Sequence, residues 1–498
     1  MTPPPIGPIR APGEYEPMDG ILLSYEGSGD WLAILDQMGA AITTTGGADV
    51  YVMADSNGEA STILTNMGAA GADVSRVHPL VVATDTIWMR DYGPRYVYEG
   101  DVRVIIDHTY NRPRPNDNGL PSQFSAIKNH RLYELGLVHG GGNFHINGLG
   151  IGHATRLINN ENPTLTEQEI IQIWSDYQGL DTQLYTPFPT FIDSTQHLDM
   201  WMQVIGHNEA IISDWPFDVG STQDQICDNT AAALQKAGYT IHRIPARSVG
   251  GTHYTYTNVV MCNDLVLLPM YTNSQASQHN AEALAVWEAA VPNKTVVQIN
   301  CQAIVTASGV MHCIAMHLPA PIGGQDPTVF IQSNFGGALF SGGQQQALNW
   351  ISDDDEGTVE ADILLSLDGG QTWPVNVLSG TQDDGFENLT MPDIFAINAK
   401  IRVVARDADG RTGSFDMPDS FIINGSRFCP ADLFPNNGNG TFGDGLVDGN
   451  DLDEVMAHWG DGFGYYDIAP PLGNNHYGDG YVTIADMVEV ITAMGACP

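Results

Sequence analysis

Basic residues are scarce in this sequence. It contains 19 Lys plus Arg against 59 Asp plus Glu in 498 residues, a formal net charge of −40 at pH 7. Binding to nucleic acid depends on clustered cations that neutralise phosphates, and anionic membrane surfaces attract the same kind of cluster. The charge balance therefore argues against a nucleic-acid partner and against an anionic membrane surface.

Long apolar runs are missing too. No stretch approaches the roughly 18 apolar residues of a membrane-spanning helix, so we expect no membrane span. Residues 1–20 lack the apolar segment of a signal peptide, which leaves a cytoplasmic protein or the mature form of an exported one. Six cysteines in a chain of this length do not form a disulfide scaffold.

Residues 1–325 are expected to form an α/β domain, because short apolar runs alternate there with amphipathic helical patterns. Thr164 and Glu167 stand at the spacing of a capping box, which predicts a helix start. Strands are predicted at 20–25, 50–54, 102–107, 149–153, 210–215, 259–271 and 295–300, and helices at 30–42, 165–178, 227–239 and 280–291.

Residues 326–427 have a different pattern. Helical periodicity disappears, and alternating stretches at 360–370, 399–410 and 419–425 are separated by turn signals such as "DGGQTW" and "DADGRTG". This pattern predicts an Ig-like β-sandwich of about 100 residues. The alternative is a β extension of the first domain.

Residues 428–498 contain an internal repeat with a period of 35 residues. Each copy places Gly directly after an Asp, then an acid six residues later, then an apolar helix, as in a calcium-binding EF-hand loop. The repeat resembles a dockerin type I module, which implies structural Ca²⁺ and a cohesin-like or surface partner. The alternative is a Gly/Asp-rich stalk without metal. Cys429 and Cys497 bracket the module and are candidates for a disulfide. The candidate calcium ligands are Asp432, Asp444, Asp448, Asp451, Asp467, Asp479 and Asp486.

Three stretches of the first domain carry candidate chemistry. They are "DTIWMRDYGPRYV" with Asp91, "FIDSTQHLDMWMQV" with His197 and Asp199, and "ASGVMHCIAMHLP" with Cys313. If "HLD" lies on a strand, its imidazole and carboxylate point to one face. A distant cysteine then completes a set of nucleophile, acid/base and anion.

Each of these signals is weak alone, since most lone cysteines are buried packing residues, and Cys227, Cys262 and Cys301 are assigned to that role. His139, His145 and His153 suggest zinc, but the glycine-rich segment between them does not supply the fixed spacing of a zinc site.

In combination the motifs resemble the guanidine-modifying deiminase superfamily, in its branch of agmatine deiminases and bacterial peptidylarginine deiminases. "WMRDYGP", "GGGNF", "HLDMW", "YTYTNVVMCNDLVLLPMY" and "GVMHCIAMHLP" occur in the order of that branch, between about residues 10 and 320. The resemblance implies a five-bladed pseudosymmetric α/β propeller, the pentein fold, with the active site at its centre.

The resemblance also implies roles for the motif residues. Asp91 and Asp199 grip a guanidinium, Cys313 attacks its carbon as thiolate, and His197 donates a proton to the leaving ammonia and then activates water. The reaction needs no cofactor or catalytic metal. Trp88 is a candidate for stacking on the substrate, with a core indole as the alternative.

The stretch "YNRPRPNDN" holds two of the few arginines, Arg112 and Arg114. It resembles the segment with which the periodontal-pathogen type of peptidylarginine deiminase reads a C-terminal carboxylate. The proline after each arginine favours extended backbone, which places both side chains on one side. The alternative is a solvated loop. Asn258 matches a substrate-contacting position, whereas Ser194 replaces an aromatic residue of that enzyme type.

The sequence therefore predicts a deiminase of peptides or proteins with C-terminal arginine, secreted or held at the cell surface. The appended modules favour export. Agmatine or free arginine is the nearest alternative substrate, and free arginine also carries the carboxylate. A second alternative is an inactive propeller that serves as a binding module.

Overall fold

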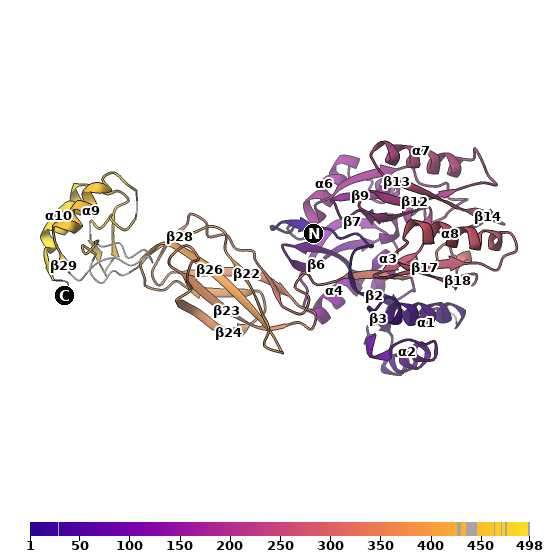
Figure 1. Cartoon of the computed structure of the whole chain (residues 1–498), viewed down its shortest axis with the longest axis horizontal. Coiled ribbons are helices and arrows are strands. Elements are labelled where there is room, and N and C mark those ends of the chain that lie inside the picture. Colours follow the sequence, from indigo (N-terminus) through magenta and orange to yellow (C-terminus); the bar gives the residue numbers. More distant parts are fainter. Residues whose placement is uncertain are drawn as a thin grey trace. The chain divides into compact units, whose positions relative to one another are not determined.

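The structure is a computed structural model of the whole chain, and it describes residues 1–27, 29–425, 430–434, 446–462, 464–469, 471–473 and 476–496. The chain divides into two compact units, Met1–Pro321 and Ile322–Pro498 (Figure 1). The predicted boundary at 325 lies four residues from this division, and the predicted division at 427 stays a prediction.

Unit 1 repeats one local topology five times within its described residues. An antiparallel strand pair is followed by a helix and by a strand parallel to the second member of the pair. A parallel neighbour requires such a crossover. The repeats are β19 (Met316–Pro319), β2 (Met18–Ser24), α1 (Gly29–Thr44) and β3 (Asp49–Ala54); β5 (Arg95–Glu99), β6 (Val102–Tyr110), α4 (Pro115–Lys128) and β7 (Leu132–His139); β8 (His145–Ile146), β9 (Ile151–Thr155), α6 (Glu167–Gln178) and β10 (Asp181–Tyr185); β11 (Met202–Gly206), β12 (Glu209–Asp214), α7 (Thr222–Lys236) and β13 (Thr240–Pro245); and β16 (Val260–Cys262), β17 (Leu265–Met270), α8 (Asn280–Ala290) and β18 (Thr295–Asn300).

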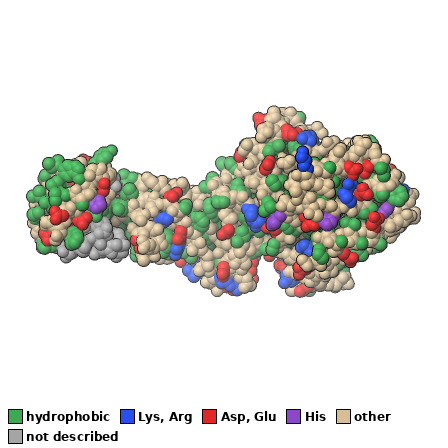
Figure 2. Space-filling view, turned by 45° about the horizontal axis from the view of Figure 1, so that its top comes forward, with side chains coloured by type: hydrophobic (Ala, Val, Ile, Leu, Met, Phe, Trp, Pro, Cys, Tyr) green, Lys and Arg blue, Asp and Glu red, His purple; other side chains and the backbone are tan. Residues whose placement is uncertain are grey.

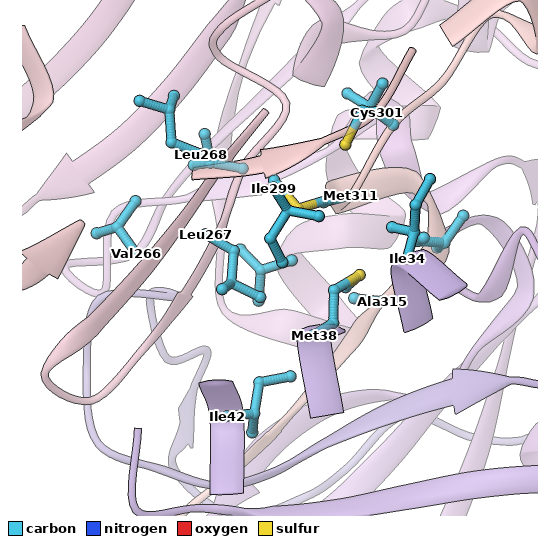
Figure 3. Packing of buried hydrophobic residues seen from close by; sticks show 14 of the residues in the cluster. Ile34, Met38, Ile42, Val266, Leu267, Leu268, Ile299, Cys301, Met311 and Ala315 are labelled. Carbon is cyan, nitrogen blue, oxygen red and sulfur yellow. The ribbon is translucent and has the colours of Figure 1, made fainter. Parts of the chain in front are cut away.

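The largest apolar cluster of unit 1 joins the first and the last repeat. Ile34, Met38 and Ile42 recur every four residues on α1 and face the buried strand β17 (Figure 3). Burying one such side chain stabilises the fold by about 1.5–3 kcal/mol. Because the last strand, β19, pairs with β2, this cluster and that pairing tie the end of the unit to its beginning.

The helix start predicted from Thr164 is wrong by two residues. Thr166 is the N-cap of α6, and it forms the capping box with Glu169. The segment contains two overlapping Thr-x-x-Glu patterns. The second is used because it begins the turn that buries Ile170 and Trp174. Two longer helices were missed, α2 (Asn57–Ala69) and α4, and both carry weak apolar faces. The short helices α3 (Met89–Tyr92) and α5 (Leu157–Glu161) were missed as well.

The first part of unit 2 is a β-sandwich-like pair of sheets without helices in its described residues up to 425. One sheet orders β20 (Thr328–Ile331), β22 (Gln345–Asp353) and β25 (Phe386–Thr390). The other orders β21 (Leu339–Ser341), β28 (Phe421–Asn424), β26 (Ala396–Asp407), β23 (Thr358–Ser366) and β24 (Val375–Gln382), with β27 (Thr412–Asp416) on β26. Trp350, Ile363 and Ile401 from three of these strands share one buried core. The period-two alternation along β26 matches this one-sided burial.

The two sequence copies near the C-terminus are also copies in structure. Helices α9 (Gly449–Ala457) and α10 (Ile484–Ala493) each start with a capping box. In the first copy Asp451 accepts hydrogen bonds from the backbone N–H groups of Leu433 and Phe434. In the second copy Asp486 accepts from the two matching N–H groups, those of Ile468 and Ala469.

The calcium assignment stays a prediction. Asp451 and Asp486, predicted as ligands, direct both carboxylate oxygens to backbone N–H groups. Asp448 caps α9, Asp467 accepts from the backbone of Asp479 and Gly480, Asp479 accepts from the backbone of Tyr481, and Asp432 is buried. Asp444, Cys429 and Cys497 lie outside the described residues.

Helix α10 presents an apolar stripe to solvent. Ile484, Val488 and Ile491 are each more than half exposed and recur at helical spacing. Met456 and Trp459, at and after the end of α9, are exposed as well. Figure 2 shows hydrophobic side chains gathered on this module. Among the described residues, no helix has both the length and the apolar character needed to cross a bilayer.

Candidate active site

One cavity of unit 1 gathers side chains that lie far apart in the sequence. Its volume is about 250 Å³. The walls come from Trp88, Asp91, Tyr110, Arg112, Arg114, Ser194, Thr195, His197, Ala307, Ser308 and Cys313. Six of the eight residues predicted for catalysis and substrate binding therefore share one cavity.

Short helical turns, rather than strands, present the reactive groups. Asp91 lies in α3 (Met89–Tyr92), and Cys313 lies in the 3₁₀ turn His312–Ile314. The expectation that "HLD" forms a strand is wrong, because His197 precedes the 3₁₀ turn Leu198–Met200, which contains Asp199. The turn still buries both side chains.

The two remaining predicted residues contact the sulfur of Cys313. Asn258 donates from Nδ2 to Sγ at 3.1 Å, and Asp199 Oδ2 lies 3.4 Å from Sγ. The Oδ1 atom of Asn258 accepts from the backbone N–H groups of Val310, His312 and Cys313, which fixes the orientation of the amide. Asn258 therefore positions the nucleophile as well as contacting it.

His197 lies beside the first carboxylate, with Nδ1 3.5 Å from Asp91 Oδ1. The glycine-rich segment leaves room for this arrangement. A Cβ atom at Gly142 would lie 2.7 Å from His197 Nδ1, 3.0 Å from Asp199 Oδ2 and 3.1 Å from Asp91 Oδ1. The backbone N–H of Gly142 also donates to Asp91 Oδ1. The "GGGN" motif thus allows backbone to approach two acids and the imidazole at once.

Two atoms of the site are buried without a hydrogen-bond partner among the described residues. They are Asp199 Oδ1 and His197 Nε2. Buried polar atoms are nearly always satisfied, and exceptions concentrate at catalytic and ligand-binding sites. A carboxylate oxygen beside a thiol can accept a hydrogen bond from a guanidinium N–H, and an imidazole nitrogen there can exchange a proton with a bound group.

The electrostatics of the site keep the thiol protonated. Burial, followed by the carboxylates of Asp199 and Asp91, raises the pKa of Cys313 well above its usual value. Burial lowers the pKa of His197, but Asp91, Asp199 and neighbouring acids outweigh it and raise that pKa overall. The substrate-free site therefore combines a neutral thiol with a protonated imidazole.

The two carboxylates differ in environment. Burial raises the pKa of Asp91 despite the charge of His197. For Asp199 burial acts in the same direction, but the hydrogen bond and charge of His312 outweigh it and lower the pKa. Asp199 is thus the carboxylate whose ionised form the site secures best.

Arg112 and Arg114 stand where β6 ends and α4 begins. Arg114 is the residue before the first turn of α4, with φ −128° and ψ 89°, outside the helical region that the following Pro115 disfavours. It donates to Tyr110 Oη at 2.9 Å and to Thr86 Oγ1 at 3.3 Å. The side chain of Arg112 is exposed and makes no hydrogen bond or ion pair with any described residue, whereas its backbone oxygen accepts from the N–H of Arg114. Both side chains line the cavity that holds Cys313.

Trp88 is half-buried, and its stacking on a substrate stays a prediction. It lines the cavity and also packs edge-on against Trp31, with ring centroids 6.0 Å apart. The three histidines considered for zinc have separate partners. His139 stacks on His108, His145 lies beside His312, and His153 bonds to Tyr185 and Tyr239.

Three residues of the site, two buried and one half-buried, were not found from the sequence. Glu14, Arg90 and His312 form a charged network next to Asp199. His312 directly precedes Cys313, which is the one local signal for it. Glu14 has no such signal, because its partner lies 298 residues away.

Comparison with known families identifies the unit. The model of the Porphyromonas-type peptidyl-arginine deiminase family matches residues 10–319. The chain belongs to this family. Its relatives include the putative agmatine deiminase of Selenomonas ruminantium, 24% identical over 290 residues, and the agmatine deiminase of Ectopseudomonas mendocina, 24% identical over 302 residues. These matches cover 49% and 51% of this chain, and 77% and 80% of the relatives.

Solved structures show the same fold for this deiminase. A putative arginine deiminase from Porphyromonas gingivalis superposes with a TM-score of 0.55 at 19% identity, over 63% of this chain and 98% of that one. The agmatine deiminase of Enterococcus faecalis also gives 0.55 at 19% identity, over 63% and 96%. The pentein-type deiminase fold thus accounts for unit 1, and a guanidino-group hydrolase is the class of enzyme it belongs to.

Proposed function

We propose that this deiminase converts C-terminal arginine of peptides or proteins to citrulline and ammonia. The observation that carries the proposal is the placement of Arg112 and Arg114 in the cavity of Cys313. A carboxylate held by this pair belongs to the same substrate residue as the guanidinium at the sulfur. We infer that the five repeats of unit 1 close around this cavity as a propeller.

The reaction follows from the protonation states. A cationic guanidinium between Asp91 and Asp199 offsets the two charges that raise the pKa of Cys313, so substrate binding itself favours the thiolate. The thiol releases its proton to solvent, and Sγ then bonds to the guanidinium carbon. The C–N bond breaks as His197 gives its proton to the departing ammonia, and a thiouronium forms.

Hydrolysis completes the cycle. His197, now neutral, removes a proton from a water that attacks the thiouronium carbon. The C–S bond breaks, which leaves a ureido group on the substrate and the thiol on Cys313. Arginine and water thus yield citrulline and ammonia, with no cofactor or metal in any step.

The energetic argument for the carboxylate uses charged hydrogen bonds. Each is worth about 1.5–3 kcal/mol, and 1.4 kcal/mol corresponds to a factor of ten. Because Arg112 is exposed, solvent screening reduces its share. We therefore expect a preference for a free α-carboxylate of about 100-fold.

Agmatine is the second candidate, because relatives of this chain carry the name agmatine deiminase. Agmatine has an amine and no carboxylate, so the positive charges of Arg112 and Arg114 oppose its binding at the mouth of this cavity. Free arginine satisfies the pair and differs from the peptide only in its charged α-amine. An inactive binding module is disfavoured, because the nucleophile, the imidazole and both acids lie together.

The assay that tests the proposal measures ureido product from three substrates. They are a peptide that ends in arginine, free arginine and agmatine, each with the Cys313→Ala variant as blank. We expect the highest kcat/KM for the peptide and the lowest for agmatine. Agmatine as the best substrate, or activity that survives in Cys313→Ala, contradicts the proposal.

We propose in addition that unit 2 attaches the enzyme outside the cell. The apolar stripe of α10 and the exposed Met456 and Trp459 support a protein partner, of the cohesin-like or surface type. The repeated acidic loops support structural Ca²⁺.

A further inference from the structure

A chain of buried charges extends from Asp199 into the interior of unit 1. Asp199 Oδ2 lies 2.8 Å from His312 Nδ1, and His312 Nε2 lies 3.1 Å from Glu14 Oε2. Glu14 in turn accepts from Arg90 Nη1 at 2.7 Å, and Arg90 Nη2 lies 2.7 Å from His317 Nδ1. Asp199, His312 and Arg90 are at most 1% exposed.

The contacts of His312 fix its protonation state. Each of its ring nitrogens faces a carboxylate, which only accepts hydrogen bonds when ionised. A neutral imidazole has one N–H and can satisfy one of the two. Only the imidazolium donates to both. In agreement, burial and the charge of Arg90 lower the pKa of His312, but Glu14 and Asp199 outweigh them and raise it.

This contact leaves one oxygen of Asp199 for substrate. Oδ2 is occupied by His312 and lies near Sγ of Cys313, whereas Oδ1 is buried without a partner among the described residues. A buried carboxylate without a cation tends to take up a proton, and a protonated acid offers a guanidinium no negative charge to pair with.

We propose that His312 is a positioning residue for the deiminase reaction. It holds Asp199 as an oriented carboxylate whose Oδ1 receives the substrate guanidinium. Glu14 holds the imidazolium from its other side, and Arg90 fixes Glu14. The proposal rests on deimination at Cys313 but not on which arginine compound is the substrate.

A metal ion is the competing interpretation of the same residues. Ligand atoms of Glu14, His145 and His312 lie within 4.8 Å of one another. However, the guanidinium of Arg90 is bonded to Glu14, and its charge opposes a divalent cation there. A metal on His312 Nε2 would leave the Nδ1 contact with Asp199 in place, so the charge of Arg90 is the argument against it. A proton on His312 accounts for every contact without this conflict.

The test compares His312→Gln with His153→Gln. His153 is equally buried and bonded at both ring nitrogens, but to tyrosines rather than to carboxylates. The groups that face His312 and enter the pH profile are Asp199, Glu14, Arg90, His145, His317 and Cys313. We expect kcat/KM of His312→Gln at pH 7 to fall about 100-fold, mainly through KM, because one partner of a buried ion pair is removed. His153→Gln is expected to retain wild-type KM.

The pH dependence of kcat/KM is expected to change in one direction only. In the wild type the pKa of Asp199 is lowered, so its carboxylate persists on the acid side. Without the imidazolium that pKa rises, and the acid limb of kcat/KM moves to higher pH. The proposal is overturned if His312→Gln leaves both the acid limb and KM unchanged. It is also overturned if His312→Gln lowers only kcat and His153→Gln lowers kcat by the same amount.

Two further measurements keep the test decisive. If His312→Gln does not fold, the test uses Glu14→Gln instead. The acid limb of kcat/KM is then expected to shift in the same direction by a smaller amount. Histidine ring NMR of the intact protein at pH 8, assigned with either variant, is expected to show two N–H protons on His312. A single ring N–H overturns the inference. A wild type that converts no arginine compound refutes the proposed function instead, since the NMR result does not depend on turnover.

Discussion

At the scale of residues, the groups that we propose to bind a cation are the same groups that disfavour the thiolate form of Cys313. Burial, together with the carboxylates of Asp199 and Asp91 that we propose to hold the guanidinium, raises the pKa of Cys313. The arriving cation resolves this conflict, because it cancels the charge that disfavours the thiolate. Cys313 is therefore expected to react slowly with other electrophiles until substrate is bound.

The first prediction at this scale concerns alkylation of Cys313. Because its pKa is raised, iodoacetamide at pH 7 is expected to label it more slowly than an ordinary exposed thiol, and the rate is expected to rise with pH. Asp199→Asn removes one negative charge, so its labelling at pH 7 is expected to be about tenfold faster, equivalent to about one pKa unit. Mass spectrometry identifies the labelled peptide. Asp36→Asn, on α1, is the control, and equal rates in all three proteins contradict the account.

The residues that carry the chemistry were largely predictable from the sequence, whereas the residues that hold them in place were not. Cys313, His197, Asp91, Arg112 and Arg114 stand in local motifs, and the structure brings them into one cavity. Glu14 and Arg90 act through contacts across 298 and 227 residues of sequence, so no local pattern marks them. Long-range ion pairs depend on the finished fold, which a single sequence does not encode in its spacing.

At the scale of elements, strands such as β2, β3 and β17 were predicted because they are buried on both faces and form continuous apolar runs. Strands such as β7 and β10, in which buried residues alternate with more exposed ones, were missed. The short turns that carry the chemistry were not predicted either. "HLD" was considered as part of a strand, whereas a 3₁₀ turn of three residues follows His197. Such a turn is too short for periodicity to register. Helix α4 was missed because its N-terminal residues are the proline-rich stretch that read as a loop.

At the scale of the whole molecule, the deiminase fold accounts for unit 1, and we propose that unit 2 provides attachment. The described cavity and its charged network use residues of 14–317 only. A catalytic role for the acidic repeat is therefore not needed, and we assign a structural role to the calcium that we predict there.

This division predicts how metal removal affects activity. A chelator is expected to leave kcat/KM of the full chain unchanged, and a truncated protein of residues 1–321 is expected to match it within about twofold, since no catalytic contact is lost. Added Ca²⁺ is expected to raise the melting temperature of unit 2 alone, by linkage to the folded state. Steady-state kinetics and calorimetry check both. Loss of turnover on chelation contradicts a metal-independent mechanism.

The measurement closest to the central claim is the substrate preference of an Arg112→Ala, Arg114→Ala double variant. The ratio of kcat/KM for an arginine-terminated peptide to that for the same peptide with an amidated C-terminus isolates the α-carboxylate. The account predicts that the wild-type ratio of about 100 falls to near one in the double variant, while kcat for the amidated peptide stays within a few-fold. A ratio that the double substitution leaves unchanged would contradict a cavity in which two arginines hold the carboxylate of the residue that Cys313 attacks.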